Sequence, residues 1–222
     1  MTPRVTVLQL DTDFPRIAGD VGAAESYARP PQIIRIAGAS VGRIVTDRPQ
    51  DIDIAPFEEA LTQATGDIVV TSCGFLSYWQ EHLAAVAQRP FIASSLVSLN
   101  SLAQRYKPEE LCILTFDAAR LGPAHLGAWA EYARSIVGLK DDHHLRQIIT
   151  GNLDHLDPQQ ACDEICALLT SHQTPDHRHI LLECTNLPPY RAAITQATGL
   201  PVTDILTCIE AAYPGAVAQA FS

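Results

Sequence analysis

Two parts of this chain share one pattern. In each part an apolar run ends in a cysteine: DIVVTSCGF contains Cys73, and HILLECTNL contains Cys184. Each cysteine stands 17 residues before a proline, Pro90 or Pro201. Earlier in each part, a similar apolar run ends in an aspartate, as VLQLDTD and ILTFDAA. The repeat predicts two similar halves that present a cysteine at the same structural position.

The hydrophobic pattern predicts an α/β fold. Short β-branched runs alternate with longer helical patterns, and several of these have a proline near the first turn. Continuous apolar strands separated by helices are typical of a parallel sheet covered on both faces. The predicted strands are residues 5–10, 33–36, 67–71, 91–93, 111–116, 179–183 and 202–204. The predicted helices are residues 56–65, 77–88, 96–106, 123–135, 158–172 and 188–198.

The expected architecture is two pseudosymmetric, Rossmann-like parallel-sheet halves with the active site in the cleft between them. We assign residues 1–98 together with 203–222 to the half that carries Cys73, and residues 99–202 to the half that carries Cys184. Ligands of open α/β sheets bind at the carboxyl ends of the strands, where both cysteines are expected. Residues 12–32 have little periodicity and predict a long loop, either a lid or a passive surface excursion.

Composition excludes several classes of partner. The chain has 222 residues and a net charge of −10, which argues against nucleic acid and against an anionic membrane. The N-terminal segment lacks a signal-peptide pattern, so a cytoplasmic location is expected, where the six cysteines are free thiols rather than disulfides. The expected partner is a small-molecule carboxylate.

A cysteine at a strand-to-helix junction has a specific chemical environment. Unsatisfied N–H groups of the next turn face the sulfur, favour thiolate and lower its pKa towards neutrality. Gly74 and Thr185 follow the two cysteines and offer such amides. Two thiols on opposite faces of one carbon suit stereoinversion, because one removes the α-proton and the other returns a proton. The alternative is that both are small buried residues that end strands.

Other residues carry weaker signals. Asp11 ends the first predicted strand, where it either orients a substrate or forms a turn. The GAS segment at residues 38–40, which ends in Ser40, also follows a strand and can hold an anion. Cys112, Cys162, Cys166 and Cys208 are expected in the core, and the histidines show no zinc spacing, so no metal site is predicted.

These motifs resemble the aspartate/glutamate racemase superfamily, which includes hydantoin racemases, maleate isomerases and arylmalonate decarboxylases. The resemblance runs nearly end to end, through LQLDTDFPRIAGDVG, GAS, TSCGFL, ILTFDAARLGPAHL and LECTNLPPY followed by GLPVTD. It implies that no cofactor is used, that Cys73 and Cys184 are the catalytic thiols, and that a homodimer is possible. It also implies that a substrate carboxylate is held around Ser72, Gly74, Thr115 and Thr185, with Asp11 as the acidic residue that ends the first strand.

Two positions depart from the racemase pattern. Phe75 follows Gly74 where many of these racemases have Thr, and Asn186 follows Thr185 where glutamate and aspartate racemases have His or Glu. Both residues are expected to contact the substrate and to favour a less charged side chain or a non-standard acid.

The leading hypothesis is an isomerase, namely a racemase or epimerase independent of pyridoxal phosphate that acts on an amino acid or a related α-substituted carboxylate. A decarboxylase or a cis–trans isomerase of the same fold is the alternative within the superfamily. A non-catalytic small-molecule binder, or a thiol redox sensor, is the alternative from a different class.

Overall fold

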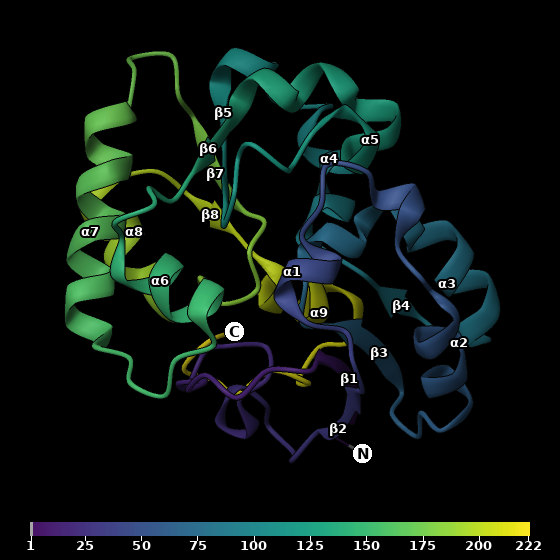
Figure 1. The fold of residues 1–222 in the computed structure, drawn as a ribbon. Helices are drawn as coiled ribbons and strands as arrows, with labels where there is room; N and C mark the ends of the chain where they lie inside the picture. Colours follow the sequence, from purple (N-terminus) through teal and green to yellow (C-terminus); the bar gives the residue numbers. More distant parts are fainter. Residues whose placement is uncertain (1) are drawn as a thin grey trace.

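The computed structural model describes residues 2–222 and contains two α/β halves (Figure 1). The strands are β1 (Val5–Leu10), β2 (Gln32–Ile36), β3 (Ile68–Thr71), β4 (Phe91–Ile92), β5 (Leu111–Thr115), β6 (Ile136–Gly138), β7 (His179–Leu182) and β8 (Val202–Thr203). The helices are α1 (Val41–Ile44), α2 (Ala55–Thr62), α3 (Gln80–Ala87), α4 (Leu99–Leu102), α5 (Pro123–Leu126), α6 (His144–Gly151), α7 (Pro158–His172), α8 (Arg191–Thr198) and α9 (Ile205–Ala212).

The strands form two four-stranded sheets with the same topology. The first sheet has the order β2-β1-β3-β4 and the second the order β6-β5-β7-β8. Every pairing in both sheets is parallel. Because each strand of the first sheet has a counterpart four numbers later in the second, the two halves are pseudosymmetric, as the sequence repeat predicts.

Hydrophobic side chains of the central strands bind the halves into one molecule. A single cluster of buried residues includes Leu8 of β1 and Ile113 of β5, together with both cysteines that end strands. Figure 1 shows α2 and α3 beside the first sheet, and α7 and α8 beside the second. A second cluster joins Val5 and Val7 of β1 to Ile205 of α9, so the C-terminal helix packs against the first sheet.

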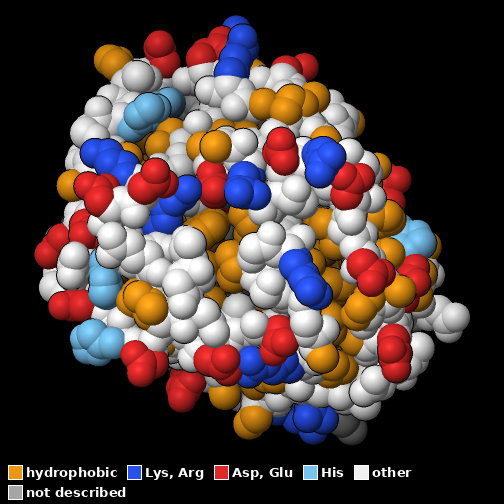
Figure 2. All heavy atoms as spheres, in the orientation of Figure 1, with side chains coloured by type: hydrophobic (Ala, Val, Ile, Leu, Met, Phe, Trp, Pro, Cys, Tyr) orange, Lys and Arg blue, Asp and Glu red, His pale blue; other side chains and the backbone are white. Residues whose placement is uncertain are grey.

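The surface facing the viewer carries charges of both signs. Figure 2 shows Lys, Arg, Asp and Glu side chains dispersed over this face, with hydrophobic side chains gathered near its middle. No helix within residues 2–222 has the length and hydropathy to span a membrane.

The structure differs from the sequence prediction in a few elements. The seven predicted strands are present, with ends that shift by at most one residue, but β6 was not predicted because its apolar run is very short. The helix predicted over 123–135 ends at Leu126, because Gly127 has a φ of 54° and breaks it. Helices α1, α6 and α9 were also not predicted, and the helix predicted over 96–106 is limited to α4 and the 3-10 turn before it.

The central strands are expected to carry most of the stability. Ile113 of β5 is fully buried, so Ile113→Ala leaves a cavity and is expected to lower the free energy of unfolding by about 2–5 kcal/mol. Ile33 of the edge strand β2 is 40% exposed, and Ile33→Ala is expected to cost no more than about 1 kcal/mol. Urea unfolding monitored by circular dichroism measures both variants. Equal losses would contradict this assignment of the core.

Candidate active site

The two cysteines occupy equivalent turns. Cys73 comes two residues after β3 ends and precedes a 3-10 turn, Gly74–Trp79; Cys184 comes two residues after β7 ends. The amide of Leu76 donates to the carbonyl of Cys73 at 3.2 Å, and the amide of Leu187 donates to the carbonyl of Cys184 at 3.1 Å. We call residues 73–76 and 184–187 the two cysteine turns.

The cysteine turns pack directly against each other. Thr185 Oγ1 donates a hydrogen bond of 2.7 Å to the carbonyl of Ser72. In the reciprocal contact, Gly74 lies against Glu183, so closely that a Cβ atom at residue 74 would stand 2.0 Å from Glu183 Oε1 and 2.6 Å from its carbonyl oxygen. Only glycine fits at position 74, and the contact holds the two halves in one relative position.

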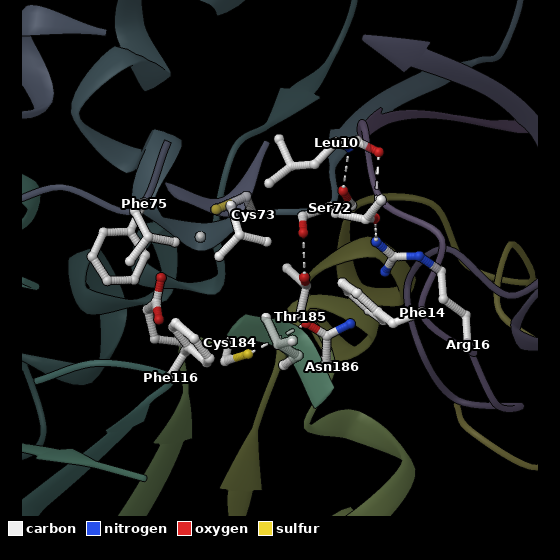
Figure 3. Close-up of a pocket in the computed structure, with 16 residues that line it drawn as sticks. Leu10, Phe14, Arg16, Ser72, Cys73, Phe75, Phe116, Cys184, Thr185 and Asn186 are labelled. Atoms are coloured by element: carbon white, nitrogen blue, oxygen red, sulfur yellow. Dashed lines mark hydrogen bonds between the residues drawn. The ribbon is translucent and has the colours of Figure 1, made fainter. Parts of the chain in front are cut away.

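A pocket lies between the halves at this contact. Its volume, including the mouth, is about 370 Å³, and both Cys73 and Cys184 line it. Figure 3 shows the two sulfurs in the middle of the pocket, with Phe75 and Phe116 on one side and Phe14 and Arg16 on the other.

Most of the residues expected at the site from the sequence line this pocket. Besides the two cysteines, they are Ser72, Gly74, Phe75, Thr185 and Asn186. The Ser72 hydroxyl accepts a hydrogen bond of 2.9 Å from the amide of Leu10, which ties the first cysteine turn to β1.

Three expected residues do not line the pocket. Asp11 accepts hydrogen bonds from Arg35 at 2.5 Å and from the amide of Gly38 at 2.8 Å, so its carboxylate closes a turn. Ser40 is exposed and precedes α1. Thr115 is fully buried, and its hydroxyl donates to Glu183 Oε2 at 2.6 Å. A role of these three residues in substrate binding stays a prediction.

Two charged residues that the sequence analysis missed line the pocket. Arg16 lies in the irregular segment after β1, a region where no pattern assigns a direction to a side chain. Glu183 lies between β7 and Cys184, and its place next to that cysteine is the one signal that pointed to it. Leu10, Thr12, Phe14, Val41, Val45, Phe116 and Ile149 complete the lining.

A chain of polar contacts connects Arg16 to the second thiol. The Arg16 guanidinium contacts Asp20 Oδ1 at 2.9 Å and Thr12 Oγ1 at 3.1 Å. Asp20 Oδ2 accepts from the Asn186 amide at 2.5 Å, and Asn186 Oδ1 lies 3.6 Å from the Cys184 sulfur as its acceptor. The segment expected as a lid or surface excursion thus forms one wall of the pocket, and Asp20 is buried within it.

Burial controls the ionisation of both thiols. It raises the pKa of Cys73 to about 12, and the negative charge of Glu183 contributes to the rise; the backbone N–H of Phe75 and the charge of Arg16 act in the opposite direction. The pKa of Cys184 is raised further, by burial and by Glu183, against the backbone N–H of Asn186. The amides that face the sulfurs belong to Phe75 and Asn186 and not, as expected from the sequence, to Gly74 and Thr185. The expected pKa near neutrality is wrong, because desolvation outweighs the one backbone hydrogen bond at each thiol.

The thiols are the reactive groups that the two halves bring together. Ionisation of Cys73 is one of the causes that raise the pKa of Cys184, so the two sulfurs interact electrostatically across the pocket. Cys112 is buried in β5, in agreement with its expected place in the core. Within residues 2–222, no three His, Cys, Asp or Glu side chains are grouped as metal ligands.

Curated proteins with similar sequences are lyases. The chain is 29% identical over 216 residues to a dimethylsulfoniopropionate lyase of Durusdinium sp. clade D, over 90% of this chain and 70% of that protein. It is 28% identical to dimethylsulfoniopropionate lyase 5 of Emiliania huxleyi, over 94% of this chain and 44% of that protein. For lyase 6 of the same organism the identity is 29%, over 93% of this chain and 58% of that protein. The chain therefore spans about half the length of these Emiliania huxleyi relatives. No family model matches the chain.

Solved structures share the fold at low sequence identity. Allantoin racemase from Pseudomonas fluorescens superposes with a TM-score of 0.60 at 15% identity, over 95% of this chain and 88% of that one. Unliganded arylmalonate decarboxylase superposes with a TM-score of 0.59 at 14% identity, over 99% of this chain and 97% of that one. A glutamate racemase of Bacillus anthracis superposes with a TM-score of 0.53 at 14% identity, over 95% of this chain and 80% of that one. The chain has the two-domain α/β fold of the aspartate/glutamate racemase superfamily, which confirms the fold that the sequence resemblance implied.

The close approach at Gly74 predicts a large effect of one methyl group. Gly74→Ala places a Cβ atom inside contact distance of both Glu183 oxygens named above, so we expect it to destabilise the protein by about 1–3 kcal/mol. Gly42→Ala is the matched control, because a Cβ atom there meets nothing within 4 Å and the residue lies in α1. Urea unfolding compares the two variants. Equal stability of both would show that the cysteine turns are not in tight contact.

Proposed function

We propose that this chain is a lyase that removes the α-proton of a small carboxylate with a cysteine thiolate and expels a group from the β-carbon, with dimethylsulfoniopropionate as the substrate. The observation that carries the proposal is a pair of thiols in one buried pocket, in a chain whose similar curated proteins are all named as lyases of this compound. The sequence resemblance favoured racemisation, whereas the names of these relatives support elimination.

Elimination and racemisation begin with the same step. A thiolate takes the proton from the α-carbon, and the electron pair of the C–H bond is delocalised into the carboxylate. In elimination, that electron pair then forms the C=C bond while the bond from the β-carbon to sulfur breaks, and its electrons leave with dimethyl sulfide. The products are acrylate, dimethyl sulfide and the proton held on the thiol, so atoms and charges balance.

Arg16 is the group best suited to hold the substrate carboxylate. Its side chain is 8% exposed, the buried Asp20 carboxylate fixes the guanidinium, and its Nε has no hydrogen-bond partner within residues 2–222. A guanidinium offers paired donors that match a carboxylate, and in a buried site these bonds strengthen as negative charge builds up on the carboxylate oxygens. Arg16 therefore serves both to bind the substrate and to stabilise the carbanion.

Racemisation is the second candidate, favoured by the pseudosymmetry of the site. Equivalent turns from the two halves deliver one thiol each, which is the arrangement that a two-base inversion needs. In that reaction both thiols move protons, whereas elimination needs only one base. The two candidates differ in how the two cysteine substitutions behave.

Removal of the thiols discriminates between the two reactions. For elimination we expect Cys73→Ala and Cys184→Ala to be unequal: the variant that lacks the base should lose about 10²–10⁴-fold of the rate of dimethyl sulfide release, and the other less. Headspace gas chromatography measures the release, with Cys112→Ala in β5 as the control.

If neither sulfide nor acrylate forms, and the protein instead inverts an amino acid or a hydantoin in D₂O with solvent deuterium at Cα, the chain is a racemase. In that case both substitutions abolish inversion.

The role of Arg16 has its own test. Arg16→Lys keeps the charge but loses the paired geometry, so we expect KM for the carboxylate substrate to rise by about 10-fold or more. Arg35→Lys is the control, because Arg35 pairs with Asp11 and Asp13 outside the pocket and should leave KM unchanged. An unchanged KM in Arg16→Lys would remove Arg16 from the binding site.

A further inference from the structure

Glu183 is a buried carboxylate that the proton transfer does not use. It stands between β7 and Cys184, is 1% exposed, and lines the same pocket as both thiols. A carboxylate in such a place is costly, because an ionised group loses its hydration when it is buried. An ionised Glu183 in the pocket therefore needs a cationic partner.

The contacts of Glu183 leave half of the carboxylate unsatisfied. Oε2 accepts the hydrogen bond from Thr115 at 2.6 Å, whereas Oε1 has no hydrogen-bond partner within residues 2–222. None of the ion pairs in this part of the chain includes Glu183. Oε1 occupies the space where Gly74 would carry a side chain, directly beside the first cysteine turn. The lone oxygen thus lies beside the turn that carries Cys73, in a residue that lines the pocket.

The surroundings of the pocket indicate which kind of partner is missing. Phe75 and Phe116 lie on the side of the pocket away from Arg16 (Figure 3). Aromatic faces attract cations that carry methyl groups, and quaternary ammonium ligands are bound in this way. A hydrated metal ion would need several oxygen ligands, and no three His, Cys, Asp or Glu side chains form such a group within residues 2–222. A methylated onium ion needs none of these ligands.

We propose that Glu183 is the counter-ion for a cationic, methylated β-substituent of the substrate, so that the pocket selects zwitterions with an onium group at one end and a carboxylate at the other. This inference rests on the proposed function and gives it a substrate class. Arg16 and Glu183 are oppositely charged groups that line the same pocket as both thiols, so Arg16 would hold the carboxylate and Glu183 the onium group of such a zwitterion.

The charge of Glu183 also affects the pKa of the two thiols. Burial raises the pKa of Glu183 to about 7, and its negative charge is one cause of the raised pKa of both thiols. When a cation pairs with Glu183, that repulsion is compensated, and the pKa of both thiols falls. The substrate thereby helps to generate the thiolate that removes its α-proton.

Two probes of nearly the same shape test the inference without any turnover. One is 3-(trimethylammonio)propionate, which is cationic at the β-substituent, and the other is 4,4-dimethylpentanoate, its neutral carbon analogue. Isothermal titration calorimetry measures both dissociation constants for the wild type, Glu183→Gln, and the exposed control Glu59→Gln. We expect the wild type and the control to prefer the cationic probe, and Glu183→Gln to lose about 10-fold or more of its affinity for that probe alone.

A second variant covers the case in which Glu183→Gln does not fold. Thr115→Val retains the carboxylate but removes its hydrogen bond, which lowers the pKa of Glu183 in the wild type. Because a cation favours the ionised carboxylate, affinity for the cationic probe should rise with pH through about 7 in the wild type and at a higher pH in Thr115→Val. A pH profile unchanged by this substitution would overturn the inference.

The outcomes separate this inference from the proposed function. If the protein releases dimethyl sulfide but Glu183→Gln still prefers the cationic probe, the counter-ion assignment is wrong and the lyase stands. If the protein binds the cationic probe through Glu183 but forms no sulfide, the onium pocket stands and the reaction is a different one. An equal loss of affinity for both probes in a folded Glu183→Gln variant would overturn the inference. It would show that Glu183 maintains the shape of the pocket instead of recognising the charge of the ligand.

Discussion

The reciprocal contact of the two cysteine turns determines the geometry of the site. Gly74 of one half lies against Glu183 of the other, and Thr185 bonds back to the carbonyl of Ser72. Because both contacts involve backbone atoms next to the cysteines, neither half can rotate without separating them. The two sulfurs are therefore placed by the packing of the halves, and the pocket between them is a consequence of the same packing.

Burial at this interface makes the charges of the pocket interdependent. Arg16, Asp20 and Asn186 connect one wall to Cys184. Glu183 interacts electrostatically with both thiols, and one of its oxygens has no hydrogen-bond partner among the residues that the structure describes. In a medium of low polarity each charge acts on its neighbours more strongly than it would in water. The ionisation of the thiols therefore depends on what occupies the pocket, which links substrate recognition to the generation of the base.

The pseudosymmetric fold does not require a symmetric reaction at this site. The two cysteine turns share one backbone hydrogen bond, from the third residue after the cysteine to the cysteine carbonyl. Their side chains differ: Ser72 and Glu183 precede the two cysteines, and Phe75 and Asn186 stand at the second position after them. Polar contacts therefore gather around Cys184, and an aromatic ring lies beside Cys73. A fold suited to a symmetric two-base reaction is thus compatible with an asymmetric substrate that has unlike ends.

The fold class, the two halves and the two cysteines could be predicted from the sequence, because these features depend on local patterns. An apolar run of strand length, followed by a cysteine and a turn, predicts the same local structure in both halves, around Cys73 and around Cys184. Asp11 shows where such reasoning fails: it does end a strand, but whether its carboxylate meets a substrate or Arg35 depends on a neighbouring strand.

The surroundings of the thiols could not be predicted, because they depend on how distant parts of the chain pack together. Arg16 lies in an irregular segment without periodicity, and the partners of Glu183 come from β5 and from the turn of the opposite half. The raised thiol pKa values follow from the same cause, since burial depends on the whole packed molecule whereas turn amides are visible in the sequence. Contacts between residues distant in sequence set the charge of the site, and no local pattern encodes them.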